Sequence, residues 1–167
     1  TQLAFAAIDQ TQTRRQDLIA HVAKYGETDL CCHRAQTPAA LAARQAAAWD
    51  PLVAWASADL GFNLPVVTGL VAANIDPEAL AALANAADAL DNFRLTALAY
   101  AADLAGSALI GLAVAHGKMD AGQAWNASTV DDAWSLEHWG EDAQARARLD
   151  VMRAEFETLA RFVAALG

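Results

Sequence analysis

Residues 25–35 read YGETDLCCHRA, and they hold the side chains of this chain that are best suited to chemistry. Cys31 and Cys32 are adjacent and are the only cysteines, His33 follows them, and a glutamate and an aspartate lie just upstream. Thiolates and imidazoles are ligands for zinc, and a cysteine beside a histidine base is a common nucleophile. The segment therefore raises three hypotheses: a metal site, a redox pair and a catalytic centre.

The spacing of these residues argues against all three hypotheses. Zinc sites usually take cysteines about two to four residues apart, whereas adjacent side chains diverge on an extended chain. Neighbouring side chains also seldom face one another, so His33 is a poor base for either cysteine. We therefore predict that Leu30, Cys31 or Cys32 fills the core as a small hydrophobic side chain, and we expect no catalytic residue, no metal and no cofactor.

The alternative is a cysteine-centred redox or metal-binding protein that uses Cys31, Cys32 and His33. It predicts a bound metal or a depressed thiol pKa. The remaining histidines have no partner at ligand spacing, and the sequence lacks the HExxH, ExxH, phosphate-loop, dinucleotide-binding and GxSxG motifs.

A second candidate is the segment VDDAWSLEHWGEDA, residues 130–143, which has five carboxylates and no Lys or Arg. Unbalanced like charges at helical spacing cost about 0.2–0.5 kcal/mol per pair, and a basic partner surface would remove that cost. Tryptophans are frequent anchors in interfaces. We therefore predict a partner-binding surface made of Asp131, Asp132, Trp134, Glu137, Trp139, Glu141 and Asp142. The alternative is a solvated acidic helix face whose indoles turn into the core.

The overall charge restricts the class of partner. The net charge is −9, and the largest basic cluster is TRR at 13–15. Nucleic acids and anionic membranes bind mainly cationic surfaces, so we expect neither as a partner. Residues 97–115 are mostly apolar but include Asp103, and alanine and glycine dominate the stretch, so we predict a helix buried in protein rather than a membrane insertion. Adjacent cysteines rarely form a disulfide, which indicates a reducing compartment.

The composition predicts the fold class. Apolar residues make up 56% of the chain and many are alanine, which favours helix, and 167 residues suit one buried core. We predict an all-α fold: a single helical domain over 1–167 with about six to eight helices and a long C-terminal helix. A short extended segment is expected near 26–34 or 62–75.

Helix ends are marked clearly in this sequence. Thr37 and Asp50 each precede a proline and are predicted N-caps, so two short helices should meet near Trp49. The same signals predict a helix after Asp76 and another after Asp120. One helix is expected over 91–116, and the stretch 130–166 is expected to be helical with a weak point at its only glycine, 140.

Three sequence blocks together resemble the assembly-chaperone family for the alpha subunit of the F-type ATP synthase catalytic head. The first block is YGETDLCCHRA, although His33 stands where the family usually has an aromatic residue. The others are Gln45 with WDP at 49–51, WA at 55–56 and Gly61, and then Asp131, Asp132, Trp134, Trp139, Gly140 and Glu141. The blocks occur in the family's order and span residues 25–142.

The resemblance implies a protein without enzymatic activity that holds the free alpha subunit and shields its interface until the beta subunit assembles. It also implies a small strand-rich N-terminal domain, so we expect 1–167 to be the C-terminal domain of a longer protein. We expect a monomer. Its location would be a bacterial cytoplasm, which the alanine-rich composition favours, or the mitochondrial matrix if the source is eukaryotic.

Overall fold

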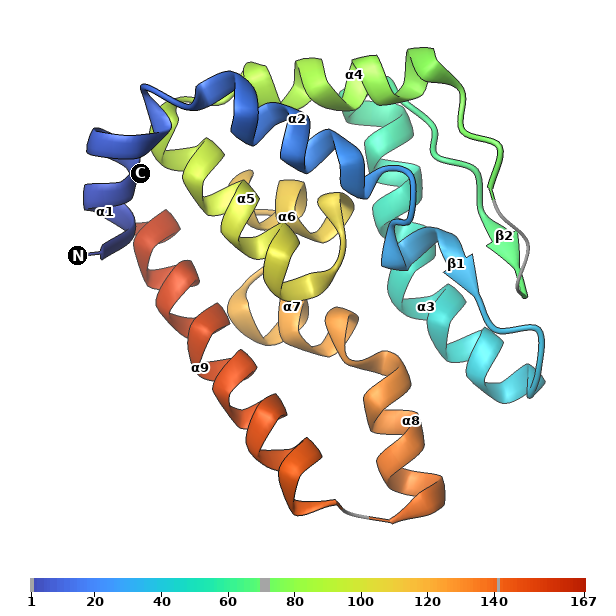
Figure 1. The fold of residues 1–167 in the computed structure, drawn as a ribbon. Helices are drawn as coiled ribbons and strands as arrows, with labels where there is room; N and C mark the ends of the chain where they lie inside the picture. Colours follow the sequence, from blue (N-terminus) through green and yellow to red (C-terminus); the bar gives the residue numbers. More distant parts are fainter. Residues whose placement is uncertain (1, 70–72, 141) are drawn as a thin grey trace.

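The computed structural model describes residues 2–69, 73–140 and 142–167, and it is predominantly helical (Figure 1). Nine α-helices lie in these ranges: α1 (Gln2–Ala6), α2 (Arg15–Tyr25), α3 (Ala39–Trp55), α4 (Pro77–Asp88), α5 (Asn92–Ala105), α6 (Ala108–Ala115), α7 (Ala121–Ser128), α8 (Val130–Trp139) and α9 (Ala143–Ala164). Three shorter helical segments are η1 (Ala7–Thr11), η2 (Leu30–Cys32) and η3 (Ala56–Leu60). The predicted all-α fold class is confirmed, as is the long C-terminal helix, but the predicted number of six to eight helices is lower than the nine in the described ranges.

Two short strands join segments that are distant in sequence. β1 (His33–Arg34) pairs in parallel with β2 (Val67–Thr68), with His33 opposite Val67. Each strand lies in one of the two segments where an extended piece was predicted, and the strands are limited to these two pairs of residues.

Several predicted helix ends are confirmed. The Asp76 carboxylate accepts a hydrogen bond from the Glu78 N–H at the start of α4. Asp120 and Gln123 form a reciprocal capping box at the start of α7. The helical stretch after residue 130 is interrupted at Gly140, whose φ of 91° is a conformation that L side chains rarely adopt.

The two short helices predicted around Trp49 are in fact one helix, α3, which continues through Pro51. A proline inside a helix removes one backbone hydrogen bond and is unfavourable locally. Trp49 and Leu52 on either side of it are both buried, so tertiary packing outweighs the local preference.

The predicted caps of those helices are also wrong. α3 begins at Ala39, with Pro38 rather than Thr37 at the N-cap position and no side-chain cap hydrogen bond. Asp50 lies inside the helix, and its carboxylate pairs with the buried guanidinium of Arg34 at 2.9 Å.

The single helix predicted over 91–116 is divided into α5 and α6. Gly106 ends α5 with a φ of 67° in the left-handed region. Ser107 begins α6, and its hydroxyl accepts a hydrogen bond from the Ile110 N–H at 3.1 Å. The break folds α6 back against α5, so the two helices pack as a hairpin.

A buried carboxylate holds this break in place. Asp29 is fully buried, and its Oδ1 accepts hydrogen bonds from the Ser107 hydroxyl at 2.7 Å and the Cys31 N–H at 3.0 Å. Its Oδ2 accepts from the Leu109 N–H at 3.2 Å. Burial raises the pKa of the Asp29 carboxyl, and these hydrogen bonds oppose that rise. Asp29 thus joins the loop after α2 to the first turn of α6.

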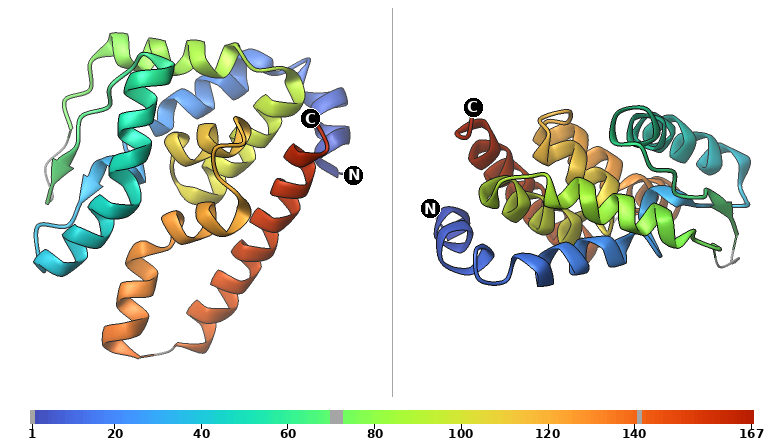
Figure 2. Two further views of the ribbon diagram at one scale, coloured as in Figure 1. Left: turned by 180° about the vertical axis from the view of Figure 1, so that it is seen from behind. Right: turned by 90° about the horizontal axis from the view of Figure 1, so that it is seen from above.

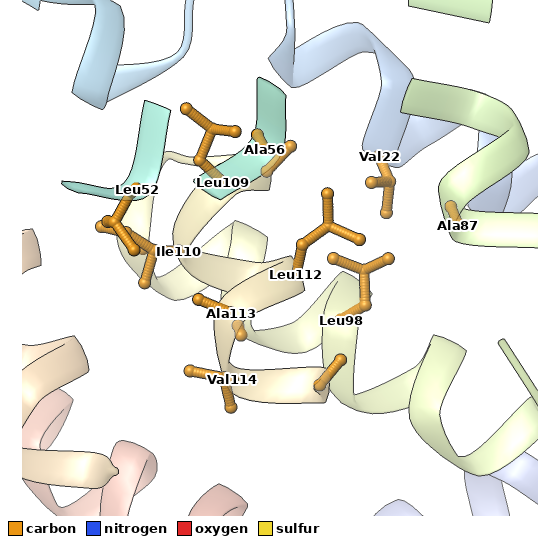
Figure 3. Close-up of a cluster of buried hydrophobic side chains, with 14 of the residues drawn as sticks. Val22, Leu52, Ala56, Ala87, Leu98, Leu109, Ile110, Leu112, Ala113 and Val114 are labelled. Carbon is orange, nitrogen blue, oxygen red and sulfur yellow. The ribbon is translucent and has the colours of Figure 1, made fainter. Parts of the chain in front are cut away.

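The α6 helix lies at the centre of the core. All its residues are buried, and it contacts α2, α3, α5, α7 and α9, which surround it (Figure 2). Leu109, Ile110 and Leu112 point toward different neighbours, including Leu52 of α3 and Val22 of α2 (Figure 3).

Close helix packing explains the small residues in this region. A Cβ on Gly111 would lie 2.9 Å from the Leu98 carbonyl oxygen, so only glycine allows α6 to approach α5 this closely. Residues 97–115 therefore form part of the core, as predicted. Among the described residues no helix is both long and apolar enough to span a membrane.

The Asp29 contacts can be tested by Asp29→Asn. A carboxamide has one acceptor oxygen, so its NH₂ group would face either the Cys31 N–H or the Leu109 N–H, and a buried donor would lose its partner. We expect the free energy of unfolding to fall by about 2–3 kcal/mol, measured by denaturant titration.

The matched control is Asp150→Asn, because Asp150 is an exposed aspartate on α9, and its effect should lie within about 0.5 kcal/mol. Equal stability of the two variants would show that the Asp29 contacts do not support the fold.

Candidate functional site

The predicted partner-binding residues that the structure describes lie on α8, apart from Asp142 at the N-cap of α9. α8 contributes no buried residue to the core, in contrast to α6. Together with the first half of α9 it forms the end of the molecule opposite α1 and α4 (Figures 1 and 2). The helix is therefore attached at the edge of the fold and is open to a partner along much of its surface.

The two tryptophans of α8 have different environments. Trp139 has 85% of its surface exposed. Trp134 is partly buried, and its ring stacks on His138 with 3.9 Å between centroids. The alternative in which both indoles turn into the core is wrong for Trp139.

Two of the α8 carboxylates pair with arginines from other elements. Glu137 Oε1 and Oε2 accept from Arg44 of α3 at 2.9 and 2.7 Å, and Asp132 pairs with Arg148 of α9. The hydrogen bond from Arg44 lowers the pKa of the Glu137 carboxyl. The premise that these acids lack balancing cations is therefore wrong for both, because the fold supplies arginines that the segment itself does not contain.

The remaining predicted acids have other partners. Asp131 accepts a hydrogen bond from the Gln45 side-chain amide at 2.7 Å. Asp142 caps α9 by accepting from the Gln144 N–H at 2.9 Å. Glu141 lies outside the described residues.

A cleft of about 300 Å³ separates α8 from the start of α9, beside the exposed indole. Its floor is apolar, from Leu136, Ala145 and the buried Leu149. Its other lining residues are Asp132, Ser135, Trp139, Gly140 and Asp142. The surface of α8 thus combines a carboxylate rim, an exposed aromatic ring and a shallow apolar hollow, which is a composition typical of a protein-binding site.

Gln45 connects α8 to the opening cluster of the sequence. It is buried, and its side-chain oxygen accepts from the Ala35 N–H at 2.7 Å while its amide donates to Asp131. The neighbouring Trp49 donates from its indole N–H to the Ala127 carbonyl at 2.7 Å, just before α8. Gln45 and Trp49 of α3 thus fix the position of α8 through these hydrogen bonds.

Sequence reasoning missed Arg44 and Arg148, which complete the α8 surface. Arg44 directly precedes Gln45 of the second family block, which is the only signal that could have drawn attention to it. The sequence gives no comparable signal for Arg148, because its pairing with Asp132 depends on the angle between α8 and α9.

Cys31 and Cys32 fill the core, as predicted. Both thiols are buried, and Cys31 Sγ lies 3.4 Å from the Ser107 hydroxyl. His33 Nδ1 lies 3.1 Å from the Asp29 carbonyl oxygen. Within the part of the chain that the structure describes, no three His, Cys, Asp or Glu side chains come together to hold a metal.

The thiol environment is the opposite of a reactive one. Burial and the nearby Asp29 charge raise the pKa of Cys31 well above its ordinary value and that of Cys32 to about 12. The redox alternative predicts a depressed thiol pKa, so the geometry does not favour it.

Several known proteins resemble this chain in sequence and in fold. A family model described as ATP12 chaperone protein matches residues 1–57. The crystal structure of Atp12 from Paracoccus denitrificans is similar, with a TM-score of 0.92 and 36% identity over 98% of this chain and 70% of that one. A mutant of the same P. denitrificans protein gives a TM-score of 0.93 and 35% identity over the same shares. A candidate chaperone from Agrobacterium tumefaciens gives 0.83 and 34% identity, over 95% of this chain and 59% of that one.

The buried state of the thiols predicts slow chemical labelling. At pH 8 a thiol with a pKa near 12 has a thiolate fraction more than about a thousandfold below that of a free cysteine. We expect a maleimide to label Cys31 and Cys32 at least about a hundredfold more slowly in the native protein than in denaturant.

Mass spectrometry of quenched time points measures the two rates. The denatured sample serves as the control, because it should take up two labels per chain. Rapid labelling of either native thiol would restore the redox hypothesis.

Proposed function

This chain belongs to the ATP12 chaperone family of ATP synthase assembly factors, and from that premise we propose that it captures the free alpha subunit of the catalytic head. In this proposal the α8 surface binds the alpha subunit and shields the interface that the beta subunit later covers. The observation that carries the proposal is Trp139, which is 85% exposed on a helix that has no fully buried residue.

An indole in this position is better explained by binding than by folding. A tryptophan contributes on the order of 150–250 Å² of surface when it is buried, which makes it a frequent hot spot in interfaces. Trp139 contributes almost none of this to the stability of the free chain. The apolar cleft beside it would receive a partner side chain. The net charge of −9 favours a basic partner, although Asp132 and Glu137 are already paired with arginines in the free chain.

We also propose that the protein acts by binding alone. The candidate cluster that looked most suited to catalysis is occupied by structural contacts: Asp29 orders the start of α6, and the thiols are buried with raised pKa values. Membership of a chaperone family supports the same conclusion. A bacterial cytoplasm is the proposed location, supported by the alanine-rich composition and by the bacterial sources of the similar structures.

The substitution Trp139→Ala tests the proposed surface. It removes the exposed ring without opening a cavity, so the thermal unfolding midpoint should not change. We expect affinity for the isolated alpha subunit to fall at least about tenfold, measured by titration with purified alpha and beta subunits in separate experiments.

Phe5→Ala is the matched control, because Phe5 is also an exposed aromatic, at 60%, but lies on α1 at the other end of the molecule. It should leave capture unchanged. The proposal is wrong if Trp139→Ala binds the alpha subunit as tightly as the unmodified chain does, or if the unmodified chain prefers the beta subunit.

A further inference from the structure

The guanidinium group of Arg44 lies in a small site on α8, where it contacts both a carboxylate and an indole ring. Its two Nη atoms meet the two Oε atoms of Glu137 at 2.9 and 2.7 Å, which is a bidentate fork. Its Cζ lies 5.0 Å from the centre of the Trp134 ring, and His138 stacks on Trp134. We name Glu137 and Trp134 the guanidinium cradle.

The cradle is specific for arginine among basic side chains. A planar guanidinium can donate two parallel hydrogen bonds to a carboxylate and stack on an indole at the same time, whereas an ammonium group is a point charge without a plane. The observed fork and ring contact use both properties.

The bond between Arg44 and the cradle is exposed and therefore easily exchanged. The Arg44 and Glu137 side chains are 46% and 51% exposed, and exposed ion pairs of this kind contribute little net stability. The chain contains a buried counterpart for comparison: the Arg34 guanidinium lies 5.1 Å from the Trp49 ring centre and pairs with Asp50, but its side chain is only 7% exposed. Arg34 and Trp49 are buried in the fold although Asp50 is exposed, whereas the Arg44 guanidinium and its partner Glu137 are both open to solvent.

Among the described residues, a second arginine pairs with a carboxylate of α8, through one contact and without an aromatic ring. Arg148 of α9 pairs with Asp132. Arginines from α3 and α9 thus each pair with one carboxylate of α8 in the free chain, although the proposed partner is basic. An arginine from the partner would meet a cradle that is already filled.

We propose that Arg44 occupies the guanidinium cradle in the free chain in place of an arginine side chain of the partner. During capture, the partner's arginine displaces Arg44 from the cradle. The identity of the partner in this inference rests on the proposed function. The preference of the cradle for arginine is independent of the proposed function. In the free chain Arg44 keeps Glu137 paired, and in the complex the partner's arginine takes its place.

If this exchange occurs, removing Arg44 should increase the affinity for the partner rather than reduce it. Removing a positive charge by Arg44→Gln would leave the cradle empty and the partner without a competitor. We expect the alpha subunit to bind about two- to fivefold more tightly to Arg44→Gln than to the unmodified chain, by titration at low salt. If Arg44 instead only positions Glu137 and Trp134, the same substitution will weaken binding.

The matched control is Arg14→Gln. Arg14 forms an exposed pair with Asp17 on α2, so this variant removes the same charge far from the cradle and should leave the affinity unchanged. Unchanged or weaker binding by Arg44→Gln, with the alpha subunit still captured by the unmodified chain, overturns the exchange and leaves the proposed function standing.

A small probe tests the cradle without the alpha subunit. N-acetyl-arginine amide should shift the Trp134 indole N–H resonance of Arg44→Gln at concentrations that leave the unmodified chain unaffected, and N-acetyl-lysine amide should be weaker. The shift should be lost in the double variant Arg44→Gln with Glu137→Gln. If the unmodified chain fails to capture the alpha subunit, the proposed function fails, and this probe alone decides whether the cradle binds arginine.

Discussion

The buried Asp29 carboxylate sets the position of the helix at the centre of the fold. It accepts hydrogen bonds from Cys31, Ser107 and Leu109, so the loop after α2 and the first turn of α6 share one group. A buried carboxylate is favourable only when its acceptor positions are filled, which restricts this turn to one arrangement. Because five helices pack on α6, the positions of those helices depend on this contact.

From the same loop a chain of contacts leads to the proposed binding surface. Arg34 lies against Trp49, and Gln45 links the Ala35 N–H to Asp131 at the start of α8. The segments that resemble the family therefore contact one another in the fold and together fix the position of α8. The support is buried and the helix that it carries is not, so α8 can present Trp139 to a partner without weakening the core.

Two helix starts that depend on hydrogen bonds between neighbouring residues were predicted correctly from the sequence. Asp76 and Asp120 were recognisable as helix caps because the hydrogen bonds that they accept come from residues two and three positions away. The break at Gly106 has local signals too, a glycine in the left-handed region and the Ser107 cap, but the prediction followed the continuous apolar stretch instead. The contact that fixes the break, between Asp29 and Ser107, spans 78 residues and cannot be derived from that stretch. The pairing of Arg44 with Glu137 spans 93 residues. The acidic segment was therefore recognised as a surface, but its charge balance could not be derived from the segment alone.

The central claim is that α8 is the surface that holds the alpha subunit. Hydrogen–deuterium exchange of this chain, alone and with isolated alpha or beta subunit, tests it most directly. We predict slower exchange over residues 130–139 with the alpha subunit, no change there with the beta subunit, and no change in α4 with either. Protection by the alpha subunit elsewhere, with exchange in α8 unaltered, would contradict the account.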